Sequence, residues 1–203
     1  MIKRKNIELA LLFGLIFSVV MSFADFDASC EGLRNNILRL HIVANSDSPD
    51  DQEVKLKVRD AILQNTSCEF EKCGDLDTAI TVAQADIEKI TRIANKTLKE
   101  NGFEYCCSAS VSKEYFDTRV YEDFTLPAGE YNSLTVRLGK AEGHNWWCVV
   151  FPGVCIPAAG EKCSLEKSVD SSDAQIAYNS EKYTVRFKTV EIYEKIRQKF
   201  KKF

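Results

Sequence analysis

The sequence predicts an α+β fold in which an antiparallel sheet of about four to five strands packs with two to three helices. Apolar residues recur at helical spacing between about residues 49 and 100 and again near the C-terminus, whereas residues 103–151 show the alternation of strands. Helices and strands that are segregated along a chain are typical of α+β layers, because parallel α/β folds alternate the two kinds of element. With 203 residues, the chain is long enough for one well-packed domain.

The first 24 residues have the pattern of an export signal. Three basic residues at positions 3–5 precede an apolar run at residues 9–20, and Ser22 and Ala24 suit cleavage after Ala24. The alternative is an uncleaved anchor, because residues 7–24 approach the ~20 residues that a spanning helix needs. In both cases we expect residues 25–203 to form a single exported α+β domain, secreted or anchored facing the same space.

A strand, a polar turn and a helix are predicted for residues 38–63. Leu38, Leu40 and Ile42 form one apolar face of the strand. Ser48 suits the N-cap of the helix, and Pro49 suits its first position, where a missing N–H costs little. Residues 64–73 are expected to form a loop. One long helix is expected from about residue 75 to residue 100, before the helix stop at residues 101–102.

Four segments after residue 102 are predicted to be strands: residues 105–111, 121–126, 134–138 and 146–151. The last is apolar on both faces, which favours a central strand in a hairpin with residues 134–138. Residues 156–180 lack periodicity and are expected to be rich in loops. A final helix, capped by Thr189, is expected to bury one face formed by Val190, Tyr193, Ile196 and Phe200. Its basic end could contact anionic lipid, although the helix dipole alone favours cations there.

All eight cysteines follow Ala24. An even number in an exported chain permits disulfides, and the first local candidates are Cys68 with Cys73 and Cys148 with Cys155. Free buried thiols are the alternative. A zinc site is disfavoured, because no CxxC motif occurs and the chain has only two histidines. We therefore expect neither a metal nor another cofactor.

Composition and motifs argue against nucleic-acid binding and against several kinds of enzyme. The formal net charge is −3 and no basic stripe occurs, which disfavours nucleic acid as a partner. The GxSxG, P-loop, Asp-Thr-Gly and Asp-Ser-Gly signatures do not occur in the sequence. His41 lies near Ser46 and Asp47, but neighbours on one turn seldom place a nucleophile, a base and an oxyanion site correctly. We predict that the protein is not an enzyme and that these turn residues satisfy backbone groups.

Two adjacent tryptophans, Trp146 and Trp147, mark a second candidate region. Successive residues of a strand point to opposite faces, so one ring can enter the core while the other faces a partner. An exposed tryptophan is a typical anchor of a protein interface. The alternative is that a helix covers the outer face and both rings belong to the core.

Two long strings connect these regions to a known family. The first, RLHIVANSDSPDDQEVKLKVRDAI, begins at Arg39, and the second, FTLPAGEYNSLTVRLGKAEGHNWWCVVFPGVC, ends at Cys155. Together with the N-terminal export pattern, these strings resemble the stage II sporulation protein R family of endospore-forming bacteria. The resemblance covers most of residues 35–155, whereas residues 156–179 and Cys163 match no pattern of the family.

The resemblance implies a signalling protein that is made in the forespore and exported into the space between the forespore and mother-cell membranes. Its implied partner is a membrane-embedded aspartic peptidase, which cleaves pro-sigma-E in the mother cell. The resemblance also implies Cys148 and Cys155 as a candidate disulfide. The alternatives are an exported hydrolase, in which His41 or Asp47 acts chemically, and a module that binds a small ligand or the cell envelope. The residues expected to bind the partner are Arg39, His41, Asn45, Asp47, His144, Asn145 and Trp146.

Overall fold

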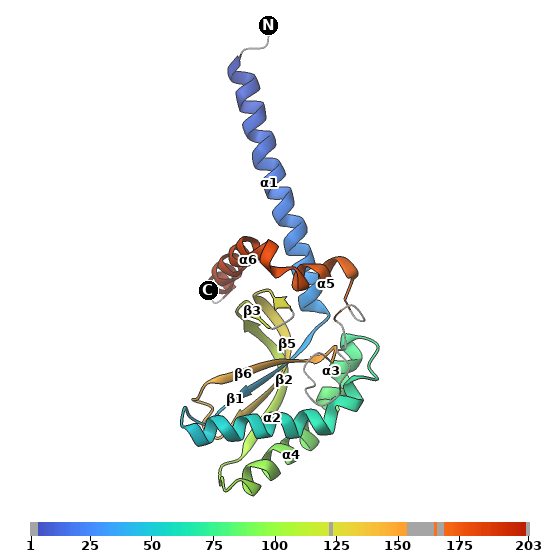
Figure 1. Ribbon diagram of the computed structural model, residues 1–203, viewed down its shortest axis with the longest axis vertical. Coiled ribbons are helices and arrows are strands. Elements are labelled where there is room, and N and C mark those ends of the chain that lie inside the picture. Colours follow the sequence, from blue (N-terminus) through green and yellow to red (C-terminus); the bar gives the residue numbers. More distant parts are fainter. Residues whose placement is uncertain (1–3, 122–123, 154–164, 166–168, 202–203) are drawn as a thin grey trace.

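An apolar N-terminal helix projects from an α+β domain in the computed structural model, which describes residues 4–121, 124–153, 165 and 169–201 (Figure 1). This helix is α1 (Arg4–Asn35). Its large apolar side chains are exposed from Ile7 to Phe17, whereas Phe26 and Leu33 are buried against the domain. By length and composition α1 could cross a membrane, and a signal sequence near the N-terminus has the same properties. The helix continues through Ala24 without a break, and cleavage after this residue stays a prediction.

The domain is built on a four-stranded sheet with the strand order β2-β5-β1-β6. Its strands are β1 (Leu38–Val43), β2 (Cys107–Phe116), β5 (Gly129–Leu138) and β6 (Asn145–Phe151). β2 pairs antiparallel with β5, and β1 pairs antiparallel with β6, whereas β1 and β5 are parallel. The predicted α+β class is confirmed, and the sheet is mixed rather than wholly antiparallel.

The predicted hairpin between residues 134–138 and 146–151 is wrong, because β1 lies between β5 and β6. β1 is buried along almost its whole length and takes a central position. β6 is an edge strand, yet it is apolar on both faces. Cys148 and Val150 pack into the cluster beneath the helices, whereas Val149 joins a second cluster on the opposite face of the sheet.

Three helices cover one face of the sheet: α2 (Pro49–Phe70), α3 (Leu76–Ala85) and α4 (Ile87–Glu100) (Figure 1). The Ser48 hydroxyl accepts a hydrogen bond from Asp51 N at 3.2 Å, which confirms the predicted cap and start of α2. The loop predicted at residues 64–73 is wrong up to Phe70, because this side chain is buried in the core and α2 continues to it.

The single helix predicted between residues 75 and 100 is divided into α3 and α4 at Asp86. Asp75 caps α3, since its Oδ1 accepts a hydrogen bond from Thr78 N at 2.8 Å. The predicted stop of α4 is confirmed: Gly102 has a φ of 84°, a conformation that glycine adopts without steric cost.

The opposite face of the sheet is covered along one half. The C-terminal part of α1, a two-stranded sheet and helix α5 (Ser171–Tyr178) pack there around Phe116 and Tyr131. The small sheet consists of β3 (Arg119–Val120) and β4 (Thr125–Leu126), which pair antiparallel. Along the other half, Ser112, Arg137 and Asn145 are exposed among the described residues. This uncovered half presents polar side chains to solvent.

Two predictions about this covering layer need correction. The strand expected at residues 121–126 is wrong in extent, because β4 contains only its last two residues and β3 ends before it begins. In the segment 156–180, predicted to be rich in loops, residues 156–164 and 166–168 lie outside the described part of the chain. Residues 171–178 form α5 and are therefore helical, with Ala174 and Ala177 buried.

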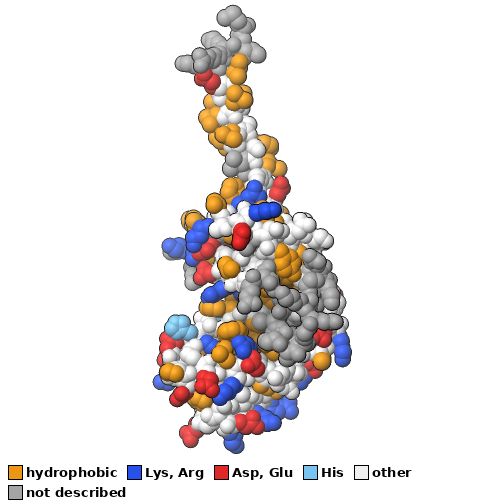
Figure 2. Space-filling view, viewed as in Figure 1, with side chains coloured by type: hydrophobic (Ala, Val, Ile, Leu, Met, Phe, Trp, Pro, Cys, Tyr) orange, Lys and Arg blue, Asp and Glu red, His pale blue; other side chains and the backbone are white. Residues whose placement is uncertain are grey.

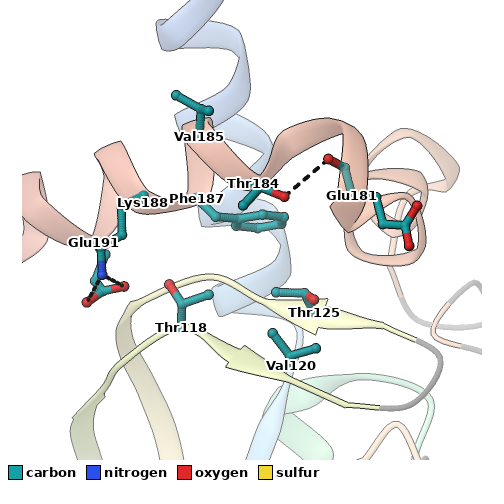
Figure 3. A pocket seen from close by; sticks show the side chains of 9 residues that line it. All are labelled: Thr118, Val120, Thr125, Glu181, Thr184, Val185, Phe187, Lys188 and Glu191. Atoms are coloured by element: carbon teal, nitrogen blue, oxygen red, sulfur yellow. Dashed lines mark hydrogen bonds and ion pairs between the residues drawn. The ribbon is translucent and has the colours of Figure 1, made fainter.

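The C-terminal helix α6 (Ser180–Lys201) starts before the predicted cap at Thr189. Its buried face contains Phe187 and Val190, which form a cluster with Phe26 of α1. The predicted buried face is wrong except for Val190, because the packing partner is α1 and the remaining members are exposed: Tyr193, Ile196 and Phe200. A cavity of about 620 Å³ lies between α6 and the β3–β4 sheet (Figure 3).

Candidate functional site

The polar turn between β1 and α2 holds the loop that leads into β6. Asn45 Oδ1 accepts a hydrogen bond from Lys140 N at 2.9 Å, and Asp47 Oδ1 accepts one from His144 N at 2.6 Å. The His144 ring also bonds to Asp47, and this hydrogen bond lowers the pKa of the Asp47 carboxyl. The predicted residues Asn45, Asp47 and His144 are thus brought together across almost 100 positions of the chain.

Asp51 is the centre of the same cluster. Its carboxylate accepts hydrogen bonds from the Asn45 amide, the Ser46 hydroxyl and the Tyr105 hydroxyl, at 2.9, 2.5 and 2.5 Å. Burial alone would raise the pKa of Asp51, but these hydrogen bonds outweigh it and hold the pKa below the usual range. The Asp51 network is therefore a charged anchor that connects the turn, helix α2 and the segment that precedes β2.

Gly143 allows the loop to lie directly against the turn. Its N–H donates to Ala44 O at 3.0 Å, and a Cβ atom built at this position would lie 2.2 Å from the carbonyl oxygen of Ser46. We expect Gly143→Ala to lower the free energy of unfolding by about 1–3 kcal/mol, because backbone must move to relieve the clash. Urea denaturation measures this change.

The control for that substitution is Gly74→Ala, since a Cβ at Gly74 meets nothing within 4 Å. This change should alter the stability by less than about 1 kcal/mol. Equal effects of the two substitutions would contradict the close contact between loop and turn.

His41 lies on the uncovered half of the sheet and is the centre of a second group of contacts. Its Nδ1 is 2.7 Å from Glu114 Oε2, and its Nε2 is 3.0 Å from Asn145 Oδ1. Its ring stacks on that of Trp147 with centroids 5.9 Å apart. The Arg119 guanidinium lies 3.6 Å from the Trp147 ring centroid, a cation–π contact. We call His41, Glu114, Arg119, Asn145 and Trp147 the His41 surface.

Because side chains alternate between the two faces along β6, its pairing with β1 decides which tryptophan belongs to this surface. Trp147 is paired with His41 and shares its face, whereas Trp146 is paired with Ile42 and packs against the core. The Arg59 guanidinium covers the Trp146 ring at 4.4 Å. Trp147 is also partly buried and packs against the second cluster. The two rings therefore lie on opposite faces of the sheet, and each packs against a core cluster. Trp147, rather than the expected Trp146, lies on the candidate surface.

Arg39, the remaining predicted residue, is fully buried under the covered half of the sheet. Its guanidinium lies 4.1 Å from the Phe116 ring centroid and 5.0 Å from that of Tyr131. Its Nη2 donates to the Tyr121 hydroxyl at 2.7 Å. This placement suits support of the sheet from within, and direct contact of Arg39 with a partner would require the covering layer to move.

Glu114 makes the His41 surface sensitive to acid. The hydrogen bond with His41 lowers the pKa of the Glu114 carboxyl below its usual value of 4.5, although burial opposes this. A carboxyl whose pKa is lowered by folding stabilises the fold above its unfolded pKa, and this contribution disappears as the pH falls through the folded value. We expect the free energy of unfolding of Glu114→Gln to fall less than that of the wild type between about pH 5 and about pH 3.

Urea denaturation over this pH range measures the difference, and Glu142→Gln, at an exposed position in the adjacent loop, controls for the loss of charge. Parallel curves for wild type and Glu114→Gln would contradict the role of the His41–Glu114 pair.

The contacts do not assemble the hydrolase considered from the sequence. The Ser46 hydroxyl donates to Asp51, and the two nitrogens of His41 face Glu114 and Asn145. Among the described residues, no group of three or more His, Cys, Asp or Glu side chains could hold a metal ion. The cavity between α6 and β3–β4 is lined by residues such as Thr118, Val120 and Phe187 (Figure 3), and Trp146 is not part of this lining.

The structure shows the oxidation state of some of the cysteines. Cys68 and Cys73 are free thiols, so the candidate bridge between them is wrong. Cys68 is exposed on α2, whereas Cys73 packs against the core beyond its end. Cys148 is disulfide-bonded. Cys155 lies outside the described residues, and its pairing with Cys148 stays a prediction.

Fold and surface together define a class of protein: an α+β domain behind an apolar N-terminal helix, with a cluster of polar and aromatic side chains on one face of its sheet. The model of the family described as "Stage II sporulation protein R" matches residues 34–161, more than half of the chain, so the chain belongs to this family. Stage II sporulation protein R of Bacillus subtilis (strain 168) is 33% identical over 140 residues. That match covers 68% of this chain and 62% of the relative, which is less than two thirds of its length. No solved structure is significantly similar to the chain.

Sequence reasoning missed Glu114, Arg119 and the Asp51–Tyr105 pair, and of the two adjacent tryptophans it selected Trp146 rather than Trp147. Alternation places Glu114 on the polar side of its strand, but nothing local in the sequence indicates that this side meets His41. The cross-strand pairing of β2, β5 and β1 creates that contact.

Proposed function

We propose that this chain is the exported forespore signal that activates the membrane-embedded peptidase for pro-sigma-E, with the His41 surface as its binding site. Family membership supports a role in sporulation. The observation that carries the binding proposal is the uncovered half of the sheet, at whose border His41 bonds to Glu114 and stacks on Trp147.

The composition of the surface fits protein recognition better than catalysis. Trp147 and Arg119 are the residue types that most often anchor interfaces, and their stacking fixes both side chains before a partner arrives. Preorganised side chains lose less conformational entropy on binding. The partner would be a segment of the peptidase that is exposed on the outer side of the mother-cell membrane.

The loop beside the surface extends the same site. Asp47 and His144 are exposed and hold the loop that delivers Asn145 to His41. In this proposal these residues shape the rim of the His41 surface, whereas Trp147 lies nearer the centre of that surface. In this proposal His41 and Asn145 are contact residues, and Asn45, Asp47 and His144 position the loop. The other two predicted residues, Arg39 and Trp146, pack inside the domain.

Activation in this proposal is a shift between two states of the peptidase. A ligand shifts such an equilibrium only by its differential affinity for the active state. If about one per cent of the free peptidase is active, a preference of about 100-fold brings the active state to about half. This preference corresponds to about 2.7 kcal/mol, which a few anchored side chains can supply.

The test is reconstitution in a bacterial host that does not form spores. The host produces the cognate peptidase and pro-sigma-E with the full chain, with a chain that lacks residues 1–24, or with neither. Cleavage of pro-sigma-E is followed by gel mobility, with immunoblots that verify all three proteins. We expect cleavage with the full chain and little with the form retained in the cytoplasm. Cleavage that is independent of this chain would overturn the proposal and favour an exported hydrolase or a ligand-binding module.

A further inference from the structure

We propose that α6 is a membrane-surface helix, whose outer face lies on the anionic lipid bilayer next to α1. This inference does not depend on the identity of the peptidase or on the His41 surface. It rests on an exposed apolar face, on the charge of the helix and on the position of α6 along α1.

Helix α6 has two apolar faces on opposite sides. Phe187 and Val190 on one side pack against Phe26 of α1. The other side carries large apolar residues that are 49–77% exposed: Val185, Ile192, Tyr193, Ile196 and Phe200. The spacing of seven and four residues between Val185, Ile192 and Ile196 aligns them along one stripe. An exposed apolar stripe of this length on a surface helix marks a contact with a protein or with lipid.

Charge favours anionic lipid in this contact. Helix α6 contains seven lysines and arginines and three glutamates, a formal charge of +4 in a chain whose formal charge is −3. Lys182 and Lys199 are exposed and lie three and seven residues from Val185 and Ile192, on the same side of the helix. Lysines beside an apolar stripe can extend to the headgroups while the apolar side chains enter the interface.

The position of α6 places this face at the level where the bilayer would end. An apolar helix needs ~20 residues to cross the hydrocarbon layer, so a span that starts at Asn6 ends near Asp25. Arg186 of α6 donates a hydrogen bond to the Ser22 hydroxyl at 2.8 Å, and Phe187 packs edge-on against Phe26. Helix α6 therefore crosses α1 at the end of its apolar segment.

The figures show the orientation of this crossing. Helix α6 lies across α1, on the side of the domain from which the apolar part of α1 projects (Figures 1 and 2). Val185 is among the residues that line the cavity beside α6, but its side chain points in the direction in which α1 rises, whereas Phe187 points toward the β3–β4 sheet (Figure 3). The exposed stripe thus faces the same way as the N-terminal end of α1.

Attachment to α1 strengthens the contact. Once α1 is in the bilayer, binding of α6 is intramolecular, so a weak interfacial affinity is multiplied by a high effective concentration. Phe26 and Cys30 follow the predicted cleavage site, so the packing of α6 on this segment does not need the preceding residues. The contact would orient the domain with the sheet edge and helices α2 and α4 away from the lipid.

Photo-crosslinking of the full chain in proteoliposomes tests this orientation. A benzophenone amino acid replaces Ile196, or Lys99 as the control on exposed α4 far from α1, in vesicles of phosphatidylglycerol and phosphatidylcholine. Unchanged far-ultraviolet circular dichroism and melting temperature verify the fold of each variant. We expect a lipid adduct at position 196, at least about tenfold above that at position 99.

The role of charge is tested in two ways: with vesicles of phosphatidylcholine alone, and with the double variant Lys182→Gln, Lys199→Gln. Each lysine near an anionic surface contributes about fivefold, so both changes should lower the adduct several-fold. A crosslink from position 196 to a second copy of the chain would assign the stripe to a dimer and overturn the proposal. Equal lipid labelling at positions 196 and 99, or none at either, would also overturn it. Loss of pro-sigma-E cleavage with normal lipid labelling would affect only the proposed function.

Discussion

Replacing Trp147 by alanine is expected to reduce pro-sigma-E cleavage in the reconstituted system by at least about tenfold, while the domain stays folded. Central aromatic anchors commonly contribute about 2 kcal/mol or more to an interface, which is about 30-fold in affinity. The Trp147 ring lies in contact with both His41 on β1 and Arg119 on β3. Cleavage is measured by gel mobility at equal levels of exported protein.

Two further variants separate recognition from folding. Trp147→Phe keeps a ring that can stack on His41 and should retain most activity. Lys113→Ala changes an exposed residue on the opposite side of β2 and should have no effect. Normal cleavage with a folded Trp147→Ala protein would show that the His41 surface is not the binding site.

Asp51→Ala is expected to cause the largest loss of stability, about 2–4 kcal/mol in the free energy of unfolding. The carboxylate accepts hydrogen bonds from Asn45, Ser46 and Tyr105, and its removal leaves three donors without this acceptor. Removing one member of a buried network costs more stability than removing the same number of exposed contacts, because the remaining polar groups cannot return fully to water. Urea denaturation measures the change.

Asp50→Ala is the matched control for this substitution. Asp50 is the preceding residue, lies in the same first turn of α2 and is exposed. Its loss should cost less than about 1 kcal/mol, since it contributes mainly through the helix dipole. Similar losses for both variants would mean that the network contributes little beyond the charge at the helix start.

Local patterns in the sequence were sufficient for most elements of the core. The Ser48 cap, the start of α2 at Pro49 and the stop at Gly102 depend on residues within a few positions of one another. Alternation in residues 105–111 and 134–138 likewise reports which side is buried. The pairing of strands could not be read in this way, because β1 enters between β5 and β6 from about 100 positions away.

The candidate site was predictable to the same degree. The sequence predicts that the polar turn residues satisfy backbone groups, and the structure shows that Asn45 and Asp47 accept hydrogen bonds from the backbone of a distant loop. The choice between Trp146 and Trp147 was open, because β6 is apolar on both faces and alternation gives no sign. The failed prediction for α6 has a similar cause: its two apolar faces look alike in sequence, and contact with α1 decides which is buried.

Crosslinking from two adjacent residues of β2 tests the central claim most directly. Ser112 and Lys113 are both exposed, and as neighbours in a strand they point to opposite faces of the sheet. A benzophenone amino acid is placed at each position in the full chain and produced with the peptidase. Crosslinks to the peptidase from position 112, but not from position 113, are the predicted result. Crosslinks from position 113 alone, or equally from both positions, would contradict a binding site on the His41 face of the sheet.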